Sequence, residues 1–183
     1  MITNKLYDAA DYIVGKDGQR IALNEAGQAV LEQFHEAERA RETLQAAWAG
    51  AMIATVFIEL TWLQAMTFEL TASAEYDDDG GSYRSITVEV RDALPVNGAD
   101  IPEDFGGSFD DFDAERAADE IKERLSGDSP LLYEAFENGS NDFSDFTLRV
   151  DRDAIAEILA TGNVKGKQAF VALFPSYAHH VTH

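Results

Sequence analysis

The longest regular pattern in the chain is an apolar stripe at helical spacing that begins after Asn24. Apolar positions recur every three or four residues, and charged residues occupy the opposite side. Asn24 suits a helix N-cap, and the carboxylate of Glu25 suits the positive end of the helix in its first turn. The sequence therefore predicts a long N-terminal helix whose stripe is formed by Val30, Phe34, Ala37, Leu44, Trp48, Met52 and Thr55.

The C-terminal part of this stripe lies in a neutral stretch. No charged residue occurs from Thr43 to Ile58, yet polar residues and the scarcity of flanking basic residues argue against a membrane span. We expect a helix that is buried on most sides or pairs with a second copy of itself. The apolar segment 43–65 is accordingly the predicted interface of a homodimer, and Gly50 marks a position for a bend.

Strict alternation of apolar and polar residues follows from Met66 to Tyr76 and again from Tyr83 to Arg91. The segment between them, Asp77–Ser82, carries three Asp and two Gly, which favour a tight turn. The pattern predicts a β-hairpin over about 66–92 with one side facing solvent.

The remaining elements are short. Residues 12–23 fit either a small hairpin or a helix end followed by one strand, and 93–112 fit a loop. Together the elements predict an α+β fold in a single domain, 1–183, with the long N-terminal helix packed on a small antiparallel sheet and with further short helices. The later elements expected are a helix from Asp113 to about Gly127, a short helix opened by Ser129 and Pro130, a strand at 146–150, a helix at 153–160 and a last strand at 168–174.

Composition excludes several functions. The 183 residues include 34 Asp+Glu and 14 Lys+Arg, for a formal net charge of −20, so direct binding of nucleic acid or an anionic membrane is unfavourable. Without Cys there is no disulfide, thiolate zinc site or cysteine nucleophile. The first residues have neither the basic nor the apolar region of a signal peptide, and we expect a cytoplasmic protein.

No catalytic signature has the required spacing. The segment 162–168 is one residue short of a phosphate-binding loop, and the acidic turn after Tyr76 has Ile86 where a calcium loop needs Glu. His179 and His183, four residues apart, are weak candidates for metal ligands. We therefore predict no catalytic residue, no metal and no cofactor.

The negative charge is concentrated in the middle of the chain. Residues 1–74 carry a net −5, residues 75–145 a net −16 and residues 146–183 a net +1. Acids that served only solubility would have little reason to gather in one segment. This acidic central segment, 75–145, is therefore the candidate interaction region.

One side of the helix predicted from Asp113 carries a row of acids. Glu115, Asp119 and Glu123 lie four residues apart, which spaces them by about 6 Å along a helix, close to the separation of successive phosphates in nucleic acid. On the other flank, Glu120 has an Arg four residues before it and another four residues after it, which favours ion pairing. The row is thus predicted to stay anionic.

These observations predict a non-enzymatic acidic protein that mimics nucleic acid and occupies the basic groove of a DNA- or RNA-binding protein. In composition it resembles the anti-restriction and anti-CRISPR inhibitors of phages and mobile elements. The alternatives are a small α+β enzyme or ligand-binding domain, and a generic acidic domain of the halophile type. The predicted partner-binding residues are Asp77, Asp78, Asp79, Asp100, Glu103, Asp104, Asp110, Asp111, Asp113, Glu115, Asp119, Glu123, Asp142 and Asp145, with Phe109 and Phe112 as aromatic anchors.

Overall fold

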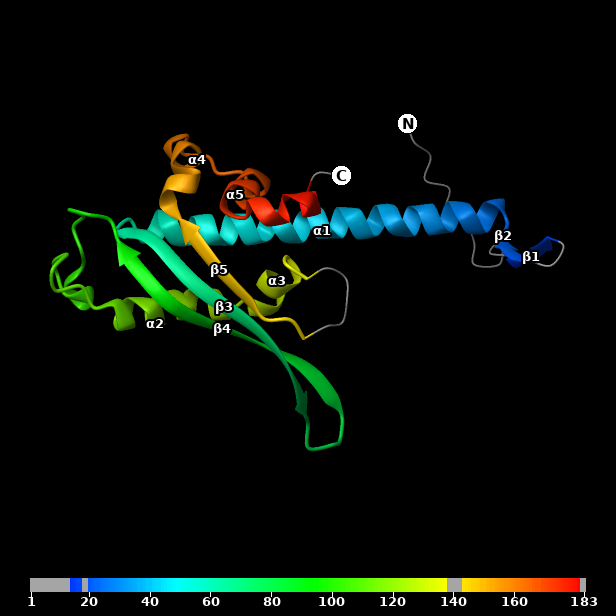
Figure 1. Ribbon diagram of the computed structural model, residues 1–183, viewed down its shortest axis with the longest axis horizontal. Coiled ribbons are helices and arrows are strands. Elements are labelled where there is room, and N and C mark those ends of the chain that lie inside the picture. The colour runs from blue at the N-terminus through cyan, green and yellow to red at the C-terminus, as the bar shows by residue number, and fades with distance from the viewer. Residues whose placement is uncertain (1–13, 18–19, 138–142, 182–183) are drawn as a thin grey trace. The chain divides into compact units, whose positions relative to one another are not determined.

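The computed structural model describes residues 14–17, 20–137 and 143–181 (Figure 1). The chain divides into two compact units, Met1–Arg41 and Glu42–His183. The boundary between the units falls inside the long helix α1, which spans Glu25–Glu59.

The first unit consists of a small hairpin and the beginning of α1. Strands β1 (Val14–Asp17) and β2 (Arg20–Leu23) pair antiparallel, so the hairpin alternative is correct for the described part of this segment. Asn24 caps α1 as predicted, because its Oδ1 accepts a hydrogen bond of 2.8 Å from the backbone N–H of Gly27. Most of the helix within this unit is exposed, including Phe34 at 57%.

The second unit is built around a three-stranded antiparallel sheet with the order β4-β3-β5 (Figure 1). Its strands are β3 (Leu63–Tyr76), β4 (Ser82–Pro95) and β5 (Phe146–Asp151). β3 and β4 form the predicted hairpin, which extends beyond its expected limits at the ends of both strands that lie away from the polar turn. The α+β fold class is confirmed.

The two faces of the sheet differ as the alternation predicts. Phe68 pairs with Val90 on one neighbour and with Leu148 on the other, and Phe68 and Leu148 belong to the buried core. On the opposite face, exposed Arg91 lies 2.7 Å from a carboxylate oxygen of Glu69. One face therefore faces the core and the other faces solvent.

Short helices complete the second unit. Helix α2 contacts β4, and α3 contacts both β3 and β4. A single core cluster joins the buried side chains of the sheet, α2, α3, α5 and the second half of α1. The helices are η2 (Glu103–Phe105), α2 (Ala114–Ser126), α3 (Ser129–Glu134), η3 (Arg152–Ile155), α4 (Ala156–Ala160), α5 (Gly166–Leu173) and η4 (Pro175–Val181).

The predicted last strand at 168–174 is wrong, because this segment forms helix α5. A short apolar run fits a buried strand and a buried helix equally well by periodicity alone. Burial of Ala169, Phe170 and Leu173 follows helical spacing. Packing against α1 favours the helix over the strand for this segment.

Two glycines permit this packing. A Cβ atom at Gly50 would lie 2.2 Å from the carbonyl oxygen of Gly166, and one at Gly166 would lie 1.9 Å from the carbonyl oxygen of Ala47. The two backbones are therefore in direct contact. Gly50, where the sequence indicates a bend, serves as the point at which α5 approaches α1.

The C-terminal end of α1 is held by Arg152. Its guanidinium donates hydrogen bonds to the backbone carbonyls of Phe57, Leu60 (2.8 Å) and Leu63 (2.7 Å) and lies over the Phe57 ring. The Phe57 carbonyl lies in the last turn of α1, where carbonyls lack helical partners. Leu60, whose carbonyl also accepts from the backbone N–H of Leu63, follows the helix, and Leu63 begins β3, so the arginine joins the end of α1 to the start of the sheet. Burial lowers the pKa of this guanidinium from its usual value. None of the helices in the described residues combines the length and apolar character that crossing a membrane requires.

Candidate functional site: the surfaces on either side of helix α2

Helix α2 is positioned by its cap and its apolar stripe. The side chain of Asp113 accepts a hydrogen bond of 3.0 Å from the backbone N–H of Arg116, which makes Asp113 the N-cap. Ala117, Ile121 and Leu125 are fully buried and belong to the core that includes the sheet. The acids of α2 consequently project away from the core.

The predicted row is present on this exposed side. Glu115, Asp119 and Glu123, here called the α2 acidic row, are all exposed. Within the described part of the chain, none of the three has an ion-pair or hydrogen-bond partner on another side chain. No ion pair among the described residues therefore neutralises the row.

The basic residues of α2 are engaged elsewhere. Arg124 donates to Glu120 at 2.8 Å, as predicted, and also forms an ion pair with Glu59 of α1. Arg116 lies 3.5 Å from Asp104, although the sequence indicated pairing with Glu120. Each cation of the helix thus lies beside a carboxylate outside the row.

Lys122 is the third of these cations. It donates a hydrogen bond of 2.8 Å to Glu89 on β4. This bond holds the pKa of the Glu89 carboxyl below its usual value. The contact ties α2 to the neighbouring edge strand.

A groove lies between η2 and α2. Its volume is about 230 Å³, and it is lined by Asp104, Phe105, Arg116, Asp119, Glu120 and Glu123. Two members of the α2 acidic row thus share one concave surface with Asp104. Asp100, Glu103, Asp110 and Asp111 are exposed in the loop segment that precedes α2, and Asp111 accepts a hydrogen bond from Ser108.

The remaining predicted acids lie elsewhere. Asp77, Asp78 and Asp79 are at the tip of the β3–β4 hairpin, whereas the loop before α2 follows the opposite end of β4 (Figure 1). β4 has 14 residues, so these ends are about 40 Å apart, several times the Debye length of about 8 Å. The structure does not bring the two groups together.

The predicted acids at the hairpin tip and before β5 differ in their contacts. Asp77 accepts a hydrogen bond from the backbone N–H of Gly81 and so shapes the turn. Tyr83 donates to Glu75 at 2.8 Å, which raises the pKa of the phenol. Asp145 is exposed before β5, and Asp142 lies outside the described residues.

The two predicted aromatic anchors differ in role. Phe112 packs against Trp62, with ring centroids 5.5 Å apart, and attaches the loop to the core. Phe109 remains 46% exposed and is available for contact. Phe143, which is 54% exposed, has the same property.

No metal site is found among the described residues, in which no group of three or more His, Cys, Asp or Glu is arranged to hold an ion. His179 is exposed in η4, and His183 lies outside the described residues. The structure therefore does not test the suggestion that His179 and His183 bind a metal.

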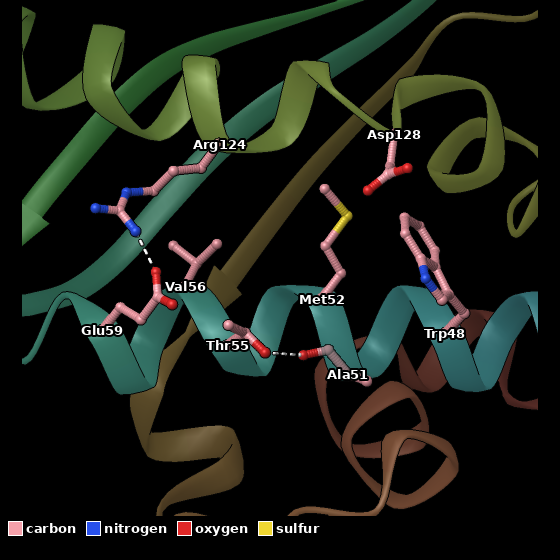
Figure 2. A pocket seen from close by; sticks show the side chains of 8 residues that line it. All are labelled: Trp48, Ala51, Met52, Thr55, Val56, Glu59, Arg124 and Asp128. Atoms are coloured by element: carbon pink, nitrogen blue, oxygen red, sulfur yellow. Dashed lines mark hydrogen bonds and ion pairs between the residues drawn. The ribbon is translucent and has the colours of Figure 1, made fainter.

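Sequence reasoning missed a second groove, on the side of α2 that faces α1 (Figure 2). This α1–α2 groove has a volume of about 420 Å³. It combines apolar side chains of α1 with three charged ones, and its lining consists of Trp48, Ala51, Met52, Thr55, Val56, Glu59, Arg124 and Asp128. Only the helical spacing of Trp48 and Met52 hinted at it, because its other wall lies some 70 residues away in the chain.

The chain matches no known family model, no curated protein and no solved structure.

Proposed function

We propose that this protein is a non-enzymatic acidic binding protein whose α2 acidic row occupies a basic, nucleic-acid-binding surface of a partner protein. The observation that carries the proposal is the contrast within α2: its cations lie beside carboxylates outside the row, whereas the row has no ion-pair partner among the described residues. Anionic groups at about 6 Å intervals on a rigid helix present a charge spacing similar to that of phosphates.

The surroundings of the row support this function. Residues 100–124 contain ten acids and three bases, so the surface formed by η2, its following loop and α2 is strongly negative. Such a surface accelerates encounter with a basic cleft and competes there with nucleic acid. Exposed Phe109 in the same loop adds an apolar contact. The hairpin tip, about 40 Å away, is outside this interface.

The proposal predicts competition with nucleic acid. DNA-binding proteins from the source cell are loaded on immobilised duplex DNA, and the purified protein is added as eluant at moderate salt. We expect it to release specific proteins, which mass spectrometry identifies. Release should weaken steeply as salt rises, because the contacts are ionic.

A matched pair of variants makes the test specific. The triple variant Glu115→Gln, Asp119→Asn and Glu123→Gln removes three exposed charges from the row. The control triple variant, Asp78→Asn, Asp79→Asn and Glu157→Gln, removes three exposed charges elsewhere. The row variant should lose release and the control should keep it. Equal loss in both would show that net charge alone acts, and no loss in either would refute the proposed surface.

A further inference from the structure

The α1–α2 groove combines an apolar floor with excess negative charge. Met52 and Val56 lie on α1 between Trp48 at one end and the Glu59–Arg124 ion pair at the other (Figure 2). Asp128, from the junction of α2 and α3, lies at the Trp48 end. At about 420 Å³, the groove is in the range of sites that hold a small ligand or a few inserted side chains.

The polar groups at the Trp48 end have no partners in the part of the chain that the structure describes. Among the described residues, neither the indole of Trp48 nor the carboxylate of Asp128 has a hydrogen-bond or ion-pair partner. Asp128 precedes α3, but its side chain makes no capping hydrogen bond. An aromatic ring and an exposed carboxylate at one end of an apolar groove are suited to a cation.

The other charges of the groove strengthen this preference. Arg124 is shared between Glu59 and Glu120, so its single positive charge faces two carboxylates. Of the residues that line the groove, Glu59 and Asp128 are acidic and Arg124 is basic, which leaves an excess of one negative charge. A cationic occupant complements this charge, and an anionic one is repelled.

We infer that the α1–α2 groove binds a basic, apolar segment of a protein partner, which places an apolar side chain over Met52 and Val56 and a Lys or Arg between Trp48 and Asp128. This inference rests on the proposed function in one respect, which is that both require a basic partner. The groove and the α2 acidic row lie on different sides of α2 and do not overlap. One partner can therefore engage both surfaces. A second copy of this chain fits the groove less well, because two chains of net charge −20 repel each other.

The two tryptophans allow a direct test. Trp48 lines the groove, whereas Trp62 is 3% exposed and packs against Phe105 at 5.0 Å. The probe is a synthetic helical peptide of Leu and Lys without aromatic residues. We expect its binding to shift the tryptophan emission to shorter wavelength, and the shift to disappear in Trp48→Phe. An oligolysine of equal charge should bind more weakly than this peptide, because it has no apolar side chain to lie over Met52 and Val56.

A pair of charge-reversal variants separates the groove from general attraction to an acidic protein. Asp128→Lys reverses a groove carboxylate, and Glu157→Lys reverses an exposed carboxylate on α4 that does not line the groove. We expect Asp128→Lys to weaken the peptide affinity by about tenfold and Glu157→Lys by less than about threefold. Equal weakening by both, or an emission that does not respond to the Leu–Lys peptide, would overturn the inference.

Two further measurements identify how a failure arises. The row variant at positions 115, 119 and 123 should still bind the peptide with the Trp48 emission shift, so loss of the proposed function and loss of the groove site are distinguishable. Sedimentation equilibrium of the protein alone tests the other occupant. A dimer that Asp128→Lys dissociates would assign the groove to a second copy and refute a basic partner there.

Discussion

Replacement of Gly50 by alanine tests the packing that makes 166–173 a helix. The added Cβ would lie 2.2 Å from the carbonyl oxygen of Gly166 and 2.5 Å from the backbone nitrogen of Phe170. Both neighbours are backbone atoms, so no side-chain rotation relieves the overlap. α5 would have to move away from α1 by more than about 1 Å to reach ordinary van der Waals distance.

The expected cost follows from two opposing effects. Overpacking in a well-packed core costs about 1–3 kcal/mol, and the upper half of that range applies because backbone must shift. Alanine in place of glycine within a helix recovers about 1 kcal/mol. We therefore expect Gly50→Ala to lower the free energy of unfolding by about 1–2 kcal/mol, and the melting temperature by about 2–8 °C for a chain of this size.

Thermal unfolding followed by circular dichroism measures this change, with Gly127→Ala as the matched control. Gly127 has a helical φ of −58° and no atom within 4 Å of a Cβ built there. Its replacement should be neutral or stabilising by up to about 1 kcal/mol. If Gly50→Ala proves as stable as Gly127→Ala, the close contact between α1 and α5 is not the packing of this protein.

Three other expectations follow from the structure. Arg152→Met should lower the free energy of unfolding by about 3 kcal/mol, because three carbonyls lose a charged donor. Arg152→Lys should recover only part of this stability, because lysine lacks the planar fork of the guanidinium. Denaturant titration measures both variants. Glu89 has a lowered pKa, so its ion pair with Lys122 adds stability above the pKa of an unfolded Glu, and this stability is lost as the pH falls through the pKa of Glu89 in the folded protein. In Lys122→Met, an NMR titration should show the Glu89 pKa returning upward. The far-ultraviolet circular dichroism should stay unchanged at about 10 mM salt, whereas unfolding there would favour the halophile-type alternative.

Local signals account for most of the elements that the sequence predicts. Asn24 caps α1, Asp113 caps α2, and the alternation on both sides of the Asp-rich turn forms β3 and β4. In each case the deciding interactions join residues close in the chain, or follow a repeating pattern of apolar positions. Such elements need little knowledge of the tertiary structure.

The misassigned and missed features depend on distant contacts. α5 is helical where Gly166 meets Gly50 across more than 100 residues of chain, and no periodicity within 168–174 records that contact. The α1–α2 groove likewise requires Trp48 and Asp128 to meet across two elements. The separation of the acids at the hairpin tip from those near α2 depends on the length of β4, which alternation predicted only in part.

An excess of acids alone does not identify a binding surface, since 34 acids and 14 bases necessarily leave many carboxylates without a cation. The position of the bases is more informative. Arg116, Lys122 and Arg124 lie on the same helix as the α2 acidic row, yet each is held by Asp104, by Glu89 or by Glu59 and Glu120. Neutralising the row from within would break contacts that attach α2 to η2, β4 and α1. Among the described residues, no base of α2 can therefore neutralise the row without losing such a contact, whereas a basic protein surface supplies several cations at once, which loose ions do not.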